Sequence, residues 1–229
     1  MSMIKTSHKQ RNDIQGLRAI AVIAVIIFHT NQAWLPGGFV GVDVFFVISG
    51  FLITSIILSQ KNNNTFEFKQ FYLNRVKRIV PAYIFLLIII SICVAIPFTT
   101  HDFEFYKDSL VKSLYFSSNQ YFARFGDYFA PNAYELPLMH TWSLAIEMQF
   151  YLLLPAFIIF LPTRYLEVSV YILIVALTTY SIYKVNLDDE SAKTYFSLIA
   201  RIPEFLIGSL LACTKLVSSN SISTLVPNA

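Results

Sequence analysis

Two ionisable side chains, Arg18 and His29, lie in the first long apolar stretch of the chain, "GLRAIAVIAVIIFHT". In an α-helix this spacing corresponds to roughly 16 Å of axial rise and just over three turns, so both side chains fall on nearly the same face. Arginine binds phosphates through charge-assisted hydrogen bonds, and histidine exchanges a proton near neutral pH. Arg18 is therefore a candidate anion-binding residue and His29 a candidate general base. The alternatives are an arginine that snorkels to the headgroups and a histidine that only joins two helices.

An acidic residue, Asp43, lies near the start of the next apolar stretch, "GGFVGVDVFFVISGFLIT". Its depth matches that of His29 in the preceding stretch, so we expect the two side chains to meet. A carboxylate bonded to one imidazole nitrogen fixes the tautomer and leaves the other nitrogen able to take a proton, as a general base requires. Asp43 is therefore placed with His29 in the candidate catalytic site.

Two later segments carry further polar residues. In "HTWSLAIEMQFY", His140, Ser143 and Glu147 can share one helical face, because side chains at these offsets stack. We take Glu147 as a catalytic candidate, and His140 and Ser143 as substrate-binding or structural residues. In "ARIPEFLIG", Arg201 and Glu204 have the spacing of an i,i+3 ion pair, which favours a structural role over substrate binding.

Two more arginines, Arg75 and Arg78, form an R-x-x-R pattern in "FYLNRVKRIVPAY". Together with Arg18 they would form a positively charged binding site for phosphates, because the guanidinium fork matches the geometry of phosphate oxygens. The alternative for both is ordinary positive charge at the cytoplasmic end of a membrane helix. Their combination with Arg18 favours a cofactor-binding role.

The composition predicts an integral membrane protein. Of the 229 residues, 55% are hydrophobic and only 14% charged, with a mean hydropathy of +0.57, which is too apolar for a water-soluble domain of this length. Basic residues cluster beside apolar runs, which favours a membrane surface and argues against nucleic acid as a partner. Cys93 and Cys213 both lie in apolar runs, so neither a disulfide framework nor a metal site is indicated.

Six stretches have the length needed to cross a bilayer as helices. We therefore predict an all-α, polytopic membrane bundle over residues 1–217, followed by a polar tail over 218–229. The aromatic and charged stretch 99–140 is expected to lie at the membrane interface, with room for one short helix. The predicted spans are 13–33, 39–59, 79–98, 141–162, 165–184 and 196–217.

The distribution of charge predicts the orientation of these spans. Lysines and arginines are concentrated before the first span and between the second and third, which places both segments in the cytoplasm. Arg18 would then lie toward the cytoplasmic side and His29 toward the outer side. A cleaved signal peptide is disfavoured, because "NQAWLPGG" leads directly into the second apolar stretch without a small-x-small cleavage site.

Five motifs together give the chain a recognisable pattern. R-x10-H, "GGFVGVDVFFVISGFLIT", "FYLNRVKRIVPAY", "LMHTWSLAIEMQFYLLLP" and "RIPEFLIG", in this order, resemble the acyltransferase-3 family of membrane acyltransferases, which includes O-antigen and exopolysaccharide O-acetylases. The resemblance implies transfer of an acyl group from acetyl-CoA, taken up on the cytoplasmic side of the bacterial inner membrane, to a hydroxyl of a surface carbohydrate. It also implies that Arg18 and His29 are essential and that Arg75 and Arg78 serve the donor.

Several points stay open at this level. His29 would act either as general base or as a transient acyl carrier. Members of the family usually have more helices, so we expect this chain to be the N-terminal part of such a domain. An inactive or structural remnant is one alternative, and a proton-coupled transporter is another, although no inverted repeat supports it. The expected partners are membrane lipids, acyl-CoA and a carbohydrate acceptor, and nothing in the sequence indicates an oligomeric state.

Overall fold

The computed structural model describes residues 12–97, 100–124, 136–188 and 191–219, and within these ranges every regular element is helical. The predicted all-α fold class is therefore confirmed. The predicted tail over 218–229 falls almost entirely outside the described residues. In chain order the elements are α1 (Asn12–Thr30), the 3-10 helix η1 (Gly38–Val40), α2 (Gly41–Asn62), α3 (Phe68–Val94), α4 (Thr100–Leu114), α5 (Ser118–Phe122), α6 (Thr141–Phe160), α7 (Thr163–Asp188), α8 (Ser191–Tyr195) and α9 (Leu198–Ser219).

Six helical segments in the described part of the chain are long and apolar enough to cross a membrane, and each corresponds to one predicted span. The third differs most from the prediction, because α3 begins at Phe68, well before the apolar run that starts near residue 79. The residues in between include no proline or glycine, so the helix continues into polar sequence. Arg75 and Arg78 therefore lie within α3, one turn apart, and not in a loop.

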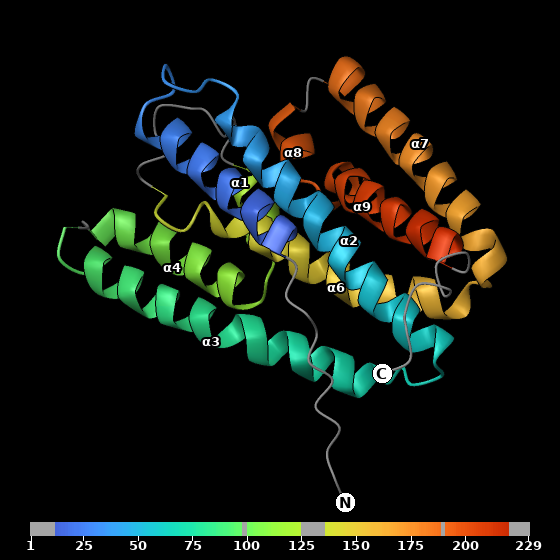
Figure 1. The fold of residues 1–229 in the computed structure, drawn as a ribbon. Helices are drawn as coiled ribbons and strands as arrows, with labels where there is room; N and C mark the ends of the chain where they lie inside the picture. The colour runs from blue at the N-terminus through green and yellow to red at the C-terminus, as the bar shows by residue number, and fades with distance from the viewer. Residues whose placement is uncertain (1–11, 98–99, 125–135, 189–190, 220–229) are drawn as a thin grey trace, which may run out of the picture.

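The stretch expected at the membrane interface forms α4 and α5, with residues 125–135 outside the description. Figure 1 shows α4 running alongside α3. Two hydrogen bonds join these helices: Tyr83 donates to the Ser113 carbonyl at 3.1 Å, and the Ser91 and Tyr106 hydroxyls lie 2.6 Å apart. These two hydrogen bonds hold α3 against α4. Because Arg75 and Arg78 lie on α3, the contact also helps to position the two arginines.

The centre of the bundle is the contact between α2 and α9, which pack against α6 (Figure 1). A Cβ on Gly50 would lie 1.9 Å from the Phe205 carbonyl oxygen, and one on Gly208 would lie 1.9 Å from the Val47 carbonyl oxygen. Only glycine permits so close a backbone approach at these two positions. The Phe205 ring of α9 stacks on the Phe46 ring of α2, with centroids 4.5 Å apart, so aromatic packing also stabilises the contact between these two helices.

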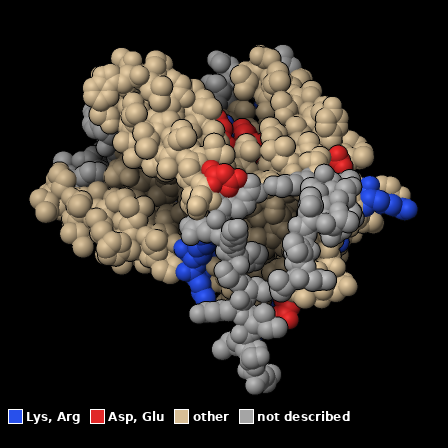
Figure 2. Space-filling view, viewed as in Figure 1, with Lys and Arg blue, Asp and Glu red and all other residues tan. Residues whose placement is uncertain are grey.

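The outer faces of the bundle are apolar. Large side chains on α1, α3 and α7, such as Ile20, Phe85 and Ile172, are exposed, as expected of helices that face lipid. Figure 2 shows few charged residues on the face drawn there. Lys61, one of the cations counted as cytoplasmic, donates hydrogen bonds to the Ile158 and Leu161 carbonyls at 2.6 and 2.7 Å and so caps the end of α6.

Candidate active site

Two adjoining cavities lie between α1, α2, α3 and α6. The larger, of about 310 Å³, is called here the arginine cavity, and the smaller, of about 270 Å³, the aliphatic cavity. Because four residues line both cavities, the two spaces meet at their side chains. These residues are Arg18, Ser49, Leu144 and Glu147.

The arginine cavity brings together the three arginines predicted to bind phosphate. Arg18 comes from α1, and Arg75 and Arg78 come from α3. The guanidinium of Arg75 lies 5.7 Å from the centre of the Phe71 ring, and its Nε is buried without a hydrogen-bond partner. A buried donor of this kind is costly unless it binds an acceptor, and a phosphate oxygen would supply one. The donor set therefore fits a phosphorylated ligand.

Glu147 lies where the two cavities meet and is held by two hydroxyl groups. Ser49 donates to its Oε1 at 2.5 Å, and Tyr151, one helical turn further along α6, donates to the same oxygen. Neither Ser49 nor Tyr151 was among the site residues predicted from the sequence. The i,i+4 spacing of Glu147 and Tyr151 was a usable signal, whereas the contact between Glu147 and Ser49 depends on how α2 packs against α6.

The aliphatic cavity extends from Glu147 toward the two histidines. Its lining includes Val25 of α1 and Ser143 of α6, which lie one turn from His29 and His140 respectively. The rings of these histidines meet edge to face, with centroids 4.8 Å apart. The predicted polar face of the fourth span is therefore present, with Ser143 and Glu147 on the cavities and His140 against His29.

The hydrogen bond of His29 determines which of its ring nitrogens can act as a base. Nδ1 lies 2.9 Å from the Val25 carbonyl oxygen, and a carbonyl can only accept. In the neutral ring Nδ1 therefore carries the proton and Nε2 the lone pair. His140 is exposed overall, but protein atoms beside its ring desolvate it in part and lower its pKa from the ordinary value, and the nearby His29 ring adds a smaller lowering.

The predicted contact between Asp43 and His29 is not formed. Arg201 of α9 binds Asp43 at 3.1 Å instead, because a guanidinium offers a full opposite charge to the carboxylate. Arg201 also binds Glu204 at 3.4 Å, as its spacing predicted, and its Nε donates to the Tyr195 carbonyl at 2.9 Å. The guanidinium stacks 4.2 Å from the Tyr195 ring centre. Asp43 thus ties α2 to α9, and the Val25 carbonyl orients His29.

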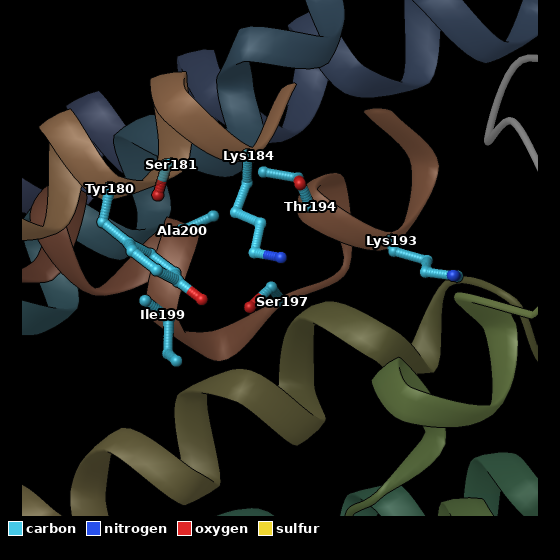
Figure 3. A pocket seen from close by; sticks show the side chains of 8 residues that line it. All are labelled: Tyr180, Ser181, Lys184, Lys193, Thr194, Ser197, Ile199 and Ala200. Carbon is cyan, nitrogen blue, oxygen red and sulfur yellow. The ribbon is translucent and has the colours of Figure 1, made fainter. Parts of the chain in front are cut away.

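A third cavity, of about 170 Å³, lies between α7 and the α8–α9 segment. Figure 3 shows the Lys184 side chain reaching in beside Ser197, while Lys193 extends away from it. None of the predicted site residues lines this cavity. Within the described residues, no group of three or more His, Cys, Asp or Glu side chains is arranged to hold a metal ion. The candidate site is therefore the pair of cavities, together with the two histidines that lie one turn beyond the lining of the aliphatic cavity.

Most of the chain is similar in sequence to one family of proteins. The family model described as "Acyltransferase domain", that of the acyltransferase-3 family, matches residues 11–227. O-acetyltransferase OatA of Staphylococcus aureus (strain NCTC 8325) is 39% identical over 209 residues, which cover 87% of this chain and 34% of that protein. Peptidoglycan O-acetyltransferase OatA of Listeria monocytogenes (strain EGD-e) is 36% identical over 214 residues, which cover 90% and 34%. No solved structure matches the chain.

The chain spans about a third of the length of these curated relatives. The match to the family model, in contrast, extends over nearly the whole chain and includes all five motifs, from Arg18 and His29 to Arg201 and Glu204. The chain therefore belongs to the acyltransferase-3 family.

Proposed function

We propose that this chain forms the donor-binding and acyl-transfer part of a membrane O-acetyltransferase, with acetyl-CoA as donor. One observation carries the proposal: the cavity lined by Arg18, Arg75 and Arg78 adjoins a second cavity that reaches within a helical turn of His29 and His140. Such a pair of spaces suits a ligand with phosphates at one end and a reactive group at the other. The three arginines would hold the phosphates, and the thioester would approach the histidines.

The imidazole of His29 would then act as the general base that removes the proton of the acceptor hydroxyl. Its Nε2 takes the proton from the acceptor hydroxyl while the hydroxyl oxygen attacks the thioester carbonyl carbon. The carbon–sulfur bond breaks, and the CoA thiolate leaves and recovers the proton from the imidazolium. In the alternative route, Nε2 itself attacks the carbonyl carbon, the carbon–sulfur bond breaks and the CoA thiolate leaves. The acceptor hydroxyl then attacks the acetyl-imidazole, the carbon–nitrogen bond breaks, and the hydroxyl proton passes to the thiolate.

The orientation in the membrane follows from charge. If the basic segments lie in the cytoplasm, as the positive-inside rule predicts, the arginine cavity opens toward cytoplasmic acetyl-CoA and the histidines lie toward the outer face. The N-terminus would then be cytoplasmic and the protein would be a multi-pass component of the bacterial plasma membrane. Acetyl groups would then be taken from acetyl-CoA on the cytoplasmic side of the membrane and transferred to the acceptor on its outer side.

The relatives guide the choice of acceptor. The Listeria relative is named a peptidoglycan O-acetyltransferase, which favours a peptidoglycan hydroxyl over O-antigen or exopolysaccharide for this protein. The complete reaction is best tested in a chimaera in which this chain replaces the matching 209-residue segment of the Staphylococcus relative. Acetyl groups released from the cell wall by mild alkali would then measure transfer.

Donor binding is tested on the chain itself, in lipid nanodiscs, by titration with acetyl-CoA. The double substitution Arg75→Ala and Arg78→Ala should weaken binding at least tenfold, since each removes charge-assisted hydrogen bonds worth roughly 1.5–3 kcal/mol. The double lysine variant should recover only part of the affinity, because lysine lacks the bidentate fork. Lys77→Ala, the matched control on α3, lies outside the cavity lining and should bind normally. Failure of the unaltered chain to bind acetyl-CoA would contradict the proposed donor.

A further inference from the structure

Glu147 lies where the arginine cavity meets the aliphatic cavity. Ser143, Glu147 and Tyr151 are spaced one turn apart on α6 and so form a row parallel to the helix axis. Ser143 lines only the aliphatic cavity, Tyr151 only the arginine cavity, and Glu147 both. A ligand that extends from one cavity into the other must therefore pass the Glu147 carboxylate.

The hydrogen bonds of Glu147 leave one of its oxygens available to such a ligand. Among the residues that the structure describes, Ser49 and Tyr151 both donate to Oε1, and Oε2 receives no hydrogen bond. Two fixed hydroxyl groups hold the carboxylate in one orientation, so Oε2 is a positioned acceptor. Apart from Glu147 itself, Arg18 and the hydroxyls of Ser49 and Ser143, the rest of the aliphatic cavity lining is hydrocarbon and offers a ligand no side-chain acceptor: Val22, Val25, Ile26, Val42, Phe45, Phe46 and Leu144.

The proposed donor has matching chemistry in its middle section. Between the phosphates and the thioester of acetyl-CoA lies the pantetheine arm, which carries two secondary amides. An amide N–H that enters an apolar channel pays a desolvation cost unless it meets an acceptor. Within the described part of the two cavity linings, Glu147 is the only carboxylate.

We propose that Glu147 Oε2 accepts a hydrogen bond from an amide N–H of the pantetheine arm, with Ser49 and Tyr151 as the residues that position the carboxylate. This inference rests on the proposed function, because it takes acyl-CoA as the donor. It makes Glu147 the residue that distinguishes a CoA thioester from a nucleotide of similar charge. The arginines recognise the phosphates, and Glu147 recognises the arm.

The test compares two ligands on the same variants in nanodiscs. Acetyl-CoA carries the arm, whereas 3′-phosphoadenosine 5′-diphosphate keeps the phosphates and lacks it. Glu147→Gln presents an amide NH₂ to the arm in place of an acceptor, so it should weaken acetyl-CoA binding roughly tenfold and leave the nucleotide within about twofold. Tyr151→Phe should show the same selectivity with a smaller loss. Glu167→Gln, the matched charge change on α7, should alter neither affinity.

The outcomes separate this inference from the proposed function. Equal weakening of both ligands by Glu147→Gln would overturn the inference, because it would mean that Glu147 acts only through the neighbouring arginines. Unchanged acetyl-CoA affinity would overturn it as well. Retained nucleotide binding shows that a variant is folded, and if Glu147→Gln binds neither ligand, the ratio of affinities in Tyr151→Phe decides. If the unaltered chain binds neither ligand, the proposed function itself fails.

Discussion

The ring of His29 on α1 meets the ring of His140 at the start of α6, edge to face, with centroids 4.8 Å apart. The Val25 carbonyl accepts from His29 Nδ1 at 2.9 Å, which gives Nε2 the lone pair of the neutral ring. The pair lies a turn beyond the lining of the aliphatic cavity. His29 is thus oriented by its own helix and lies beside a second histidine.

His29→Gln should reduce acetyl transfer in the chimaera by at least roughly 10²-fold, because glutamine keeps hydrogen bonding but cannot cycle a proton. His29→Ala should do the same, and membrane levels of both proteins should match the parent. Cell-wall acetyl groups and an immunoblot of the membrane fraction provide the measurements. His101→Gln on α4 is the matched control. Unaltered transfer by His29→Gln would remove His29 from the catalytic role.

Acidification should destabilise the protein slightly through His140, because this residue is exposed and solvent screens part of the effect. Its pKa is lowered in the folded state, so the unfolded chain takes up a proton near pH 6.5 that the folded chain resists. Stability is therefore fully present above that pH and is lost as the pH falls through the window between the two pKa values. The melting temperature in detergent should drop between pH 7 and pH 5, and less so in His140→Gln. A drop of the same size in that variant would exclude His140 as the cause.

The ion pair between Asp43 and Arg201 should act on stability as a unit. Removing either partner leaves a half-buried charge without its closest counter-ion, so Asp43→Asn and Arg201→Gln should each lower the melting temperature. The double variant should lose less than the sum of the two single losses, because the second substitution removes a charge that has already lost this partner. Strict additivity in this double-mutant cycle would contradict the assignment of Asp43 to Arg201.

Alanine at either glycine of the α2–α9 crossing should destabilise the bundle. A Cβ at Gly50 or Gly208 would lie 1.9 Å from a carbonyl oxygen of the other helix, so the helices must separate, at a cost of about 1–3 kcal/mol or more. Gly16→Ala is the control, since a Cβ there has nothing within 4 Å. It should keep or slightly raise the melting temperature, because alanine favours helix. Wild-type stability of Gly50→Ala would show that the crossing is looser than described.

The orientation can be tested with single cysteines in a Cys93→Ala, Cys213→Ala background. Trp34, exposed between α1 and η1, should as Trp34→Cys react with an impermeant thiol reagent on intact cells. Asn63→Cys, at the opposite end of α2, should react only after the cells are opened. Equal labelling of the two on intact cells would contradict the cytoplasmic placement of the basic segments.

The sequence by itself determined the all-helical fold, the six membrane-spanning candidates and the family. These follow from local properties, because a helix makes its hydrogen bonds within one segment and hydropathy is a sum over neighbouring residues. The grouping of Arg18 with Arg75 and Arg78 could also be predicted, since charge bias brings the ends of α1 and α3 to one side.

Only the tertiary structure decided which side chains meet across helices. Asp43 was expected at His29 and binds Arg201, and Glu147 is held by Ser49 from a helix nearly a hundred residues away in sequence. Two residues at the same depth can face different neighbours, because contact depends on the rotation of each helix about its axis. That rotation is set by packing, here by the close approach of Gly50 and Gly208, and a hydropathy pattern does not encode it.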